Sequence, residues 1–147
     1  GFSDVLTMFL ALNASVELYK GGVVPLAEYA QRPYDRDILV RVLVPKENAR
    51  FVYQSVRNSQ TDFPVLTCAA AKLADGSIRA AIGARPGKAV LYTAAPEAGE
   101  TAEEFAARFA AEVKADIKTE SNLRGGAEYR RHLAGVLTKR AVCRLEG

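Results

Sequence analysis

The stretch of residues 62–85 constrains the fold most, because two apolar runs meet there around an Asp-Gly pair. Glycine tolerates the positive φ that a tight turn needs, so Asp75-Gly76 between apolar runs is typical of a β-hairpin. The sequence therefore predicts paired antiparallel strands at residues 65–73 and 77–84. Residues 68–73 by themselves have the composition of a helix, and the turn chemistry decides in favour of a strand.

The second strand of this hairpin alternates in character, as a strand with one buried face does. Ile78, Ala80, Ile82 and Ala84 share one face, and Ser77, Arg79, Ala81, Gly83 and Arg85 share the other. This pattern predicts a half-buried strand. The small alanine and glycine side chains would let another element pack close to the sheet, and a helix is the usual cover.

Before the hairpin, the sequence predicts one helix followed by several strands. The helix covers residues 3–12, and Ser3 or Asp4 could cap it. Its buried face would hold Leu6, Phe9, Leu10, Asn13 and Ala14. A small hairpin at residues 14–25, one helical turn at 26–30 and strands at 38–44 and 50–57 follow.

After the hairpin, the prediction is mainly helical. Residues 89–93 could form a short strand or one helical turn, and the sequence leaves both open. Thr101 and Glu104 form a capping box, which predicts a helix over residues 102–118. Its inner face would carry Phe105, Phe109, Val113 and either Asp116 or Ile117. A last helix over residues 127–144 would turn its basic residues to solvent and Tyr129, Leu133, Val136, Leu137 and Ala141 inward.

The composition argues against several classes of function. With 147 residues and 49% hydrophobic content the chain can bury a core. No apolar run is long enough to span a membrane, and no signal-peptide pattern occurs, so we expect a cytoplasmic protein without a membrane partner. The net charge is only +3 and the basic residues are dispersed except near the C-terminus, so we expect no nucleic-acid partner.

Residues with reactive side chains form no recognisable constellation. Cys68 and Cys143 lack metal-ligand spacing and are expected to be buried free thiols. His132 lies in a basic run without a catalytic partner, which favours a surface position. The carboxylate pairs Asp35/Asp37 and Glu103/Glu104 are typical of solvated surface, and no glycine-rich phosphate loop is present. The residues alone indicate a soluble α+β domain with no catalytic or metal-binding residue.

Four motifs, in a fixed order, carry a resemblance to a known family. In the first, Ser3-Asp4-Val5 opens an apolar helix that leads into the strand with Val16-Glu17-Leu18, and in the second, Val24-Pro25-Leu26 precedes Ile38-Leu39 and Val44-Pro45. In the third, Asp62-Phe63-Pro64-Val65 leads into the central hairpin. In the fourth, Ser121-Asn122-Leu123-Arg124 precedes Ala127-Glu128-Tyr129-Arg130-Arg131. Together they resemble the flavoprotein subunit of the molybdenum hydroxylases, the xanthine dehydrogenase and carbon monoxide dehydrogenase group.

The resemblance implies a role in electron transfer. Such a subunit binds FAD, which takes electrons from iron–sulfur clusters and passes them to NAD or another acceptor. Its partners would be molybdopterin-binding and iron–sulfur subunits or domains. Three positions carry over from the family as cofactor-binding: Asp4 matches a flavin-contacting Asp, Leu39 matches a Leu that packs near the flavin, and Gln54 stands where many members have a flavin-side Lys. Asn122 and Gly126 depart from the family's Asp and Ser, which weakens capping of the last helix.

The resemblance also implies an architecture. Residues 1–46 would be the C-terminal part of a PCMH-type FAD-binding domain, a small α/β remnant. Residues 47–147 would be a CO dehydrogenase flavoprotein-like C-terminal domain, an antiparallel sheet around the central hairpin covered by C-terminal helices. In the family the loops that hold the FAD pyrophosphate come before the Ser-Asp motif, so we expect this chain to be a fragment that alone binds FAD weakly or not at all. The alternative is a stand-alone module that docks partner subunits through the hairpin and the basic last helix.

Overall fold

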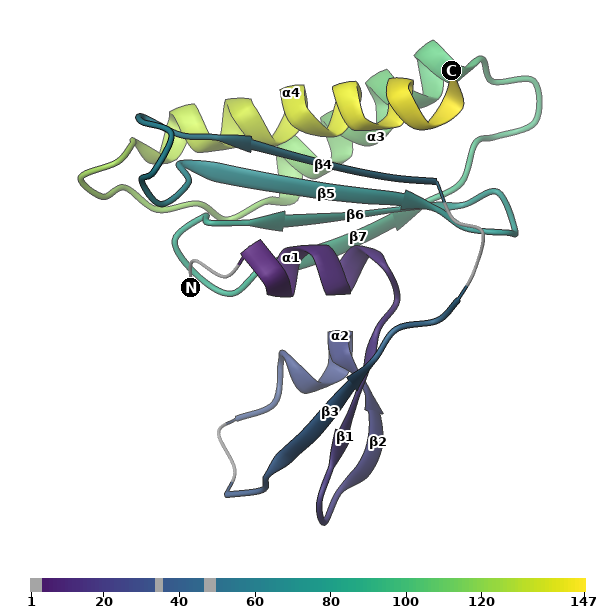
Figure 1. Cartoon of the computed structure of the whole chain (residues 1–147). Coiled ribbons are helices and arrows are strands. Elements are labelled where there is room, and N and C mark those ends of the chain that lie inside the picture. The colour runs from purple at the N-terminus through teal and green to yellow at the C-terminus, as the bar shows by residue number, and fades with distance from the viewer. Residues whose placement is uncertain (1–3, 34–35, 47–49) are drawn as a thin grey trace.

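The computed structural model describes residues 4–33, 36–46 and 50–147. Two antiparallel sheets form its framework, and the larger one is the middle of three layers, with helices α3 and α4 on one face and α1 on the other (Figure 1). The predicted Ser3 cap, the Asp35 carboxylate and residue 47 at the predicted domain boundary lie outside the described residues. The expected α+β class is confirmed.

The smaller sheet is built by the first third of the chain. After α1 (Asp4–Ala11) come β1 (Ser15–Leu18), β2 (Gly22–Pro25), α2 (Leu26–Tyr29) and β3 (Leu39–Leu43), in the sheet order β2-β1-β3. The predicted hairpin between β1 and β2 is confirmed, and Gly22 takes the positive φ of 67° that its turn requires.

The larger sheet contains the central hairpin. Its strands are β4 (Arg50–Val56), β5 (Leu66–Lys72), β6 (Ile78–Gly83) and β7 (Val90–Ala94), which lie side by side in sequence order. Ala70 pairs with Ala80 across the predicted hairpin, and Gly76 adopts a φ of 83° in its turn. Residues 89–93, for which the sequence left open a strand or a helical turn, belong to strand β7, which pairs antiparallel with β6.

The prediction that the second hairpin strand is half-buried is wrong, because both of its faces are covered. Ile78 and Ile82 pack in the core below α3 and α4, while Ala81 packs against α1 on the opposite face. The predicted close cover by a helix is confirmed at Gly83, where an added Cβ would lie 2.1 Å from the Oγ1 of Thr7 in α1. Only a glycine allows this approach of helix to strand.

Two helices cover the outer face of the larger sheet. The capping box of Thr101 and Glu104 starts α3 (Ala102–Asp116), as predicted. The stacked rings of Phe105 and Phe109, 5.9 Å between centroids, fill the core beneath it. The sequence left open whether Asp116 or Ile117 lies on the inner face. Ile117 is the buried residue, whereas Asp116 accepts a hydrogen bond from the Tyr92 hydroxyl.

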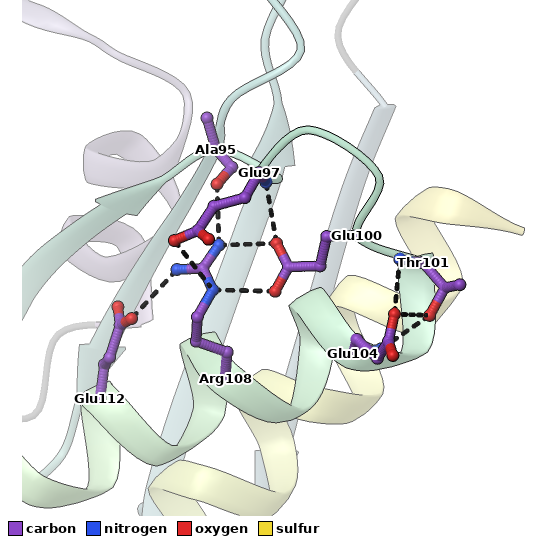
Figure 2. A network of polar contacts seen from close by, with 7 residues as sticks. All are labelled: Ala95, Glu97, Glu100, Thr101, Glu104, Arg108 and Glu112. Atoms are coloured by element: carbon purple, nitrogen blue, oxygen red, sulfur yellow. Dashed lines mark hydrogen bonds and ion pairs between the residues drawn. The ribbon is translucent and has the colours of Figure 1, made fainter.

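An ion-pair network joins the loop before α3 to the helix itself (Figure 2). Arg108 contacts Glu100 through both Nε and Nη2 at 2.8 Å, Glu112 through Nη1 at 3.0 Å, and the carbonyl of Ala95. Hydrogen bonding to Arg108 lowers the pKa of Glu100 to about 2. Glu100 also accepts the backbone N–H of Glu97, so the loop is closed on itself.

The last helix, α4 (Ala127–Glu146), corrects four predictions. Tyr129 is 49% exposed rather than inward, and Val136 is half-buried and lines a surface depression rather than the core. Cys143 is exposed rather than buried, and Arg130 is fully buried rather than solvated. The reason is that the side of α4 facing the sheet is set by Ala134 and Leu137, which turns Tyr129 outward. Cys68 is buried and His132 exposed, as predicted.

Arg130 is held without any carboxylate. Its guanidinium donates to the backbone oxygens of Val65 (2.9 Å), Glu120 (2.6 Å) and Gly125 (2.7 Å), and to the Asn122 side chain. It therefore ties the loop before α4 to the start of β5. The weak capping expected at Gly126 is also seen, because no side chain of the cap residue bonds the first turn.

Candidate functional site

A pocket opens between α1, α2 and β3, on the side of the larger sheet away from α3 and α4. Its volume is about 600 Å³. Most of the lining is apolar, contributed by Leu6, Phe9, Val16, Leu26, Leu39 and Val42. Leu6 and Phe9 belong to the predicted inner face of α1 but are only half-buried, since they form a wall of this pocket. Asn13, also predicted inward, is exposed and accepts a hydrogen bond from Arg79.

Three charged residues stand at the rim of the pocket. Lys88, in the turn between β6 and β7, donates from Nζ to the carbonyl of Ala30 at 2.7 Å and so ties the larger sheet to the end of α2. Arg32 pairs with Glu28 at 2.5 Å. The rim is thus held in place by contacts that leave few polar groups facing the apolar interior.

The third rim residue, Asp37, accepts hydrogen bonds from backbone N–H groups. It accepts the N–H groups of Lys20 (3.0 Å), Gly21 (2.8 Å) and Ile38 (2.8 Å), which fixes the β1–β2 turn against the start of β3. Partial desolvation raises the pKa of the Asp37 carboxyl, but these N–H donors outweigh it and leave the pKa below its ordinary value. An anionic carboxylate therefore sits at the pocket mouth.

Asp4 lies at the start of α1, next to two pocket-lining residues, and contacts β4. Its Oδ2 accepts a hydrogen bond from Arg57 Nη2 at 2.8 Å, and Arg57 Nη1 donates to the carbonyl of Asp62 at 2.6 Å. Burial, followed by the charge of Asp4, raises the pKa of Tyr53. The buried atoms Asp4 Oδ1 and Tyr53 Oη both lie in this cluster, where the Asp4 carboxylate acts on the Tyr53 hydroxyl.

The structure brings two of the three predicted cofactor-binding residues to one side of the molecule. Asp4 begins the helix that walls the pocket, and Leu39 lines it with 44% of its surface exposed. Gln54 faces the other way, because its Nε2 donates to the carbonyl of Leu137 in α4 at 3.4 Å. The role of all three in binding a cofactor stays a prediction.

Sequence reasoning missed Tyr53, Arg57 and Lys88. Alternation along β4 places Tyr53 and Arg57 on the face opposite to Gln54, and only knowledge that α1 covers that face would have singled them out. Lys88 carries no sequence signal, because its partner Ala30 is 58 residues away.

Strand β3 leaves a row of apolar side chains uncovered beside the pocket. The exposed residues on and around it are Ile38, Leu39, Val40, Val42, Leu43 and Val44, from 36% to 65% exposed. β3 is also an edge of its sheet. A contiguous apolar surface of this kind is typical of a contact with another polypeptide or a ligand.

The described part of the chain offers neither a membrane-spanning helix nor a cluster of metal ligands. Across residues 4–33, 36–46 and 50–147, no helix is both long and apolar enough to cross a membrane. The same residues contain no group of three or more His, Cys, Asp or Glu side chains able to hold a metal ion.

Residues 51–145 match the family model of the CO dehydrogenase flavoprotein C-terminal domain. The chain belongs to this family. The resemblance to the flavoprotein subunits of molybdenum hydroxylases that the motifs predicted is thereby confirmed. No curated protein sequence matches the chain.

Solved structures share the fold. Carbon monoxide dehydrogenase from Hydrogenophaga pseudoflava superposes with a TM-score of 0.77 at 22% identity over 97% of this chain. Quinoline 2-oxidoreductase from Pseudomonas putida 86 gives 0.75 at 19% identity over 98%. Carbon monoxide dehydrogenase from Oligotropha carboxidovorans gives 0.76 at 20% identity over 97%. In each case this chain spans 56% of the other chain's length.

Proposed function

We propose that this chain is part of the FAD-binding, electron-transfer subunit of a cytoplasmic molybdenum hydroxylase, and that the pocket between α1, α2 and β3 receives the flavin ring system. The observation that supports this most is the pocket itself: about 600 Å³ of mostly apolar space walled by Leu6, Phe9 and Leu39. A planar heteroaromatic ring suits such walls. Arg32, Asp37 and Lys88 add polar groups at its rim.

The residues present fit the ring and not the whole dinucleotide. A pyrophosphate needs converging backbone N–H donors at a glycine-rich loop, and the sequence offers no such loop. Because the chain spans only 56% of the related structures, we propose that another part of the subunit holds the phosphates. On this proposal the 147-residue chain alone binds FAD weakly or not at all.

Each residue of the site has a role that its contacts support. Leu6, Phe9 and Leu39 exclude water from the ring. Arg57 orients the Asp4 carboxylate at the start of the helix that walls the pocket. FAD, when bound, supplies the capacity to take electrons from iron–sulfur clusters and pass them to NAD or another acceptor. The partners would be molybdopterin-binding and iron–sulfur subunits or domains, with neither a membrane nor a nucleic acid.

The test measures flavin content in the natural gene product that contains these residues. We expect it to be purified with yellow, protein-bound flavin, and Leu39→Asp to lower the flavin-to-protein ratio at least about tenfold, because a carboxylate enters an apolar wall. Val40→Asp is the matched control, since Val40 is equally exposed on β3 but does not line the pocket. Asp4→Asn and Gln54→Ala then test the other two predicted positions.

A second candidate is a module that docks partner subunits without a cofactor. The exposed apolar side chains of β3 favour it, because they would suit a protein contact as well as a ligand. A gene product that forms a stable complex with a partner subunit and contains no flavin would favour this candidate and contradict the first.

A further inference from the structure

Helix α4 lies on the far side of the larger sheet from α1 (Figure 1). Its outer surface carries a shallow groove. Val136 and Cys143 form its apolar floor, and Lys139, Arg140 and Arg144 form its rim. Its volume is about 320 Å³. We call these five residues the α4 groove.

A second depression continues the α4 groove towards α3. It has a volume of about 220 Å³ and shares Val136 and Lys139 with the first. Gly135 lets α3 approach closely here, since an added Cβ would lie 3.3 Å from Lys114 Cβ and 3.4 Å from the Ala110 carbonyl. The two depressions together form one strip with an apolar floor, and Lys114 extends the basic rim onto the neighbouring helix.

The cations of this strip are not neutralised. Among the described residues, Lys114, Lys139, Arg140 and Arg144 form no ion pair, and no carboxylate lines either depression. Arg108, near the other end of α3, is by contrast surrounded by glutamates (Figure 2). Arg144, in the last turn of α4, interacts favourably with the helix dipole, whereas like charges four residues apart, as at positions 140 and 144, destabilise a helix.

We propose that the α4 groove docks an acidic amphipathic segment of a partner protein. Carboxylates of that segment would pair with the rim, and its apolar stripe would cover Val136 and the floor. The apolar floor favours a protein over a nucleic acid, because a phosphate backbone gains nothing by covering it. The inference does not depend on the proposed flavin site, which lies on the opposite face of the sheet.

The probe is a fluorescent synthetic helix with a leucine stripe flanked by glutamates, titrated into the full 147-residue chain and followed by anisotropy. A peptide of the same composition in scrambled order, which has no stripe, and a short duplex DNA are the comparison ligands. We expect saturable binding of the striped helix that weakens as salt is raised, with backbone NMR shifts confined to α3 and α4. Binding of the scrambled peptide should be at least about fivefold weaker, because it cannot cover the floor.

Variants locate the site. Lys139→Glu with Arg140→Glu should weaken binding of the striped helix at least about tenfold at low salt. The matched control, Lys20→Glu with Lys46→Glu, makes the same charge change at exposed sites beside the smaller sheet and should leave affinity within about twofold. Equal loss in both double variants would overturn the proposal, as would equal binding of the scrambled peptide. Duplex DNA that binds more tightly than the striped helix, and loses binding in the first variant, would also overturn it.

Discussion

The two sheets of this molecule differ in how completely they are covered. In the larger sheet both faces of the central hairpin are buried, by α3 and α4 on one side and by α1 on the other. In the smaller sheet all five residues of β3 are exposed. The larger sheet therefore has a core on both faces of its hairpin, whereas the smaller sheet leaves the apolar side chains of an edge strand exposed.

Helix α1 links the covered larger sheet to the exposed smaller sheet. It precedes the smaller sheet in sequence but packs on β5 and β6 through Thr7 and Ala11. One wall of the pocket is consequently fixed by the rigid sheet, while β3 forms the other wall at an open edge.

The largest loss of stability is expected at Arg130, whose buried guanidinium ties the loop before α4 to the larger sheet. Arg130→Met should lower the free energy of unfolding by about 3–5 kcal/mol, because it leaves three backbone carbonyls and Asn122 without their buried donor. Urea denaturation measures this change. The adjacent exposed Arg131→Met should change it by less than about 0.5 kcal/mol. Similar losses of unfolding free energy in the two variants would mean that the hydrogen bonds of Arg130 do not hold this loop in place.

The contact between α1 and the larger sheet gives the next effect. Gly83→Ala should cost about 1–3 kcal/mol, because its Cβ would lie 2.1 Å from Thr7 Oγ1 and 2.6 Å from Thr67 Oγ1. Adding Thr7→Ala should restore part of the loss in the same denaturation measurement. Gly87→Ala is the control, since its Cβ meets nothing closer than 3.5 Å. Full stability of Gly83→Ala would show that α1 does not lie this close to β6.

The ion-pair network before α3 should give a smaller, pH-dependent effect. The pKa of Glu100 is lowered to about 2 by Arg108. Because the folded-state pKa lies below the ordinary value, the stabilisation is complete above about pH 4.5 and is lost as the pH falls towards 2. In Arg108→Gln, carboxyl NMR titration should show the pKa of Glu100 moving up towards 4.5, while Glu104, whose pKa is lowered by Thr101, should stay low. An unmoved Glu100 would contradict the pairing.

The smallest effect is expected on the open sheet. Val40→Thr should change the free energy of unfolding by less than about 0.5 kcal/mol, because Val40 is already 47% exposed. The same substitution at Val65, which is buried beside the larger sheet, should cost about 1–3 kcal/mol because the hydroxyl is buried. Thermal unfolding of the two variants side by side measures the difference. Equal costs would mean that β3 is as well covered as the larger sheet.

Local signals predicted the secondary structure well. Asp75-Gly76 fixed the hairpin and Thr101 with Glu104 fixed the start of α3, since both signals act over a few residues. Burial was harder to predict. The sequence cannot distinguish Arg130 from Arg131, because the acceptors that bury Arg130 come partly from Val65, 65 residues away. The same limit explains why β6 was expected to have an open face.

The candidate site depended on the family resemblance more than on pattern. Asp4 and Leu39 came from matched motifs and lie on the pocket side of the molecule, while Gln54 lies on the other face of β4. Lys88 could not have been predicted, since its contact with Ala30 joins two parts of the chain that are 58 residues apart. Which residues line a pocket between two sheets is a property of their packing.

The most direct test of the account titrates the 147-residue chain with lumiflavin, the flavin ring without ribityl phosphate or adenine, and follows methyl NMR signals. If the pocket receives the ring, binding is weak, as expected for this chain alone, and the methyl groups of Leu6, Leu39 and Val42 shift together in fast exchange, while those of Val136 in the α4 groove do not move. Lumiflavin that leaves the pocket methyl groups unchanged up to its solubility limit, or shifts only signals elsewhere, would contradict the proposed flavin site.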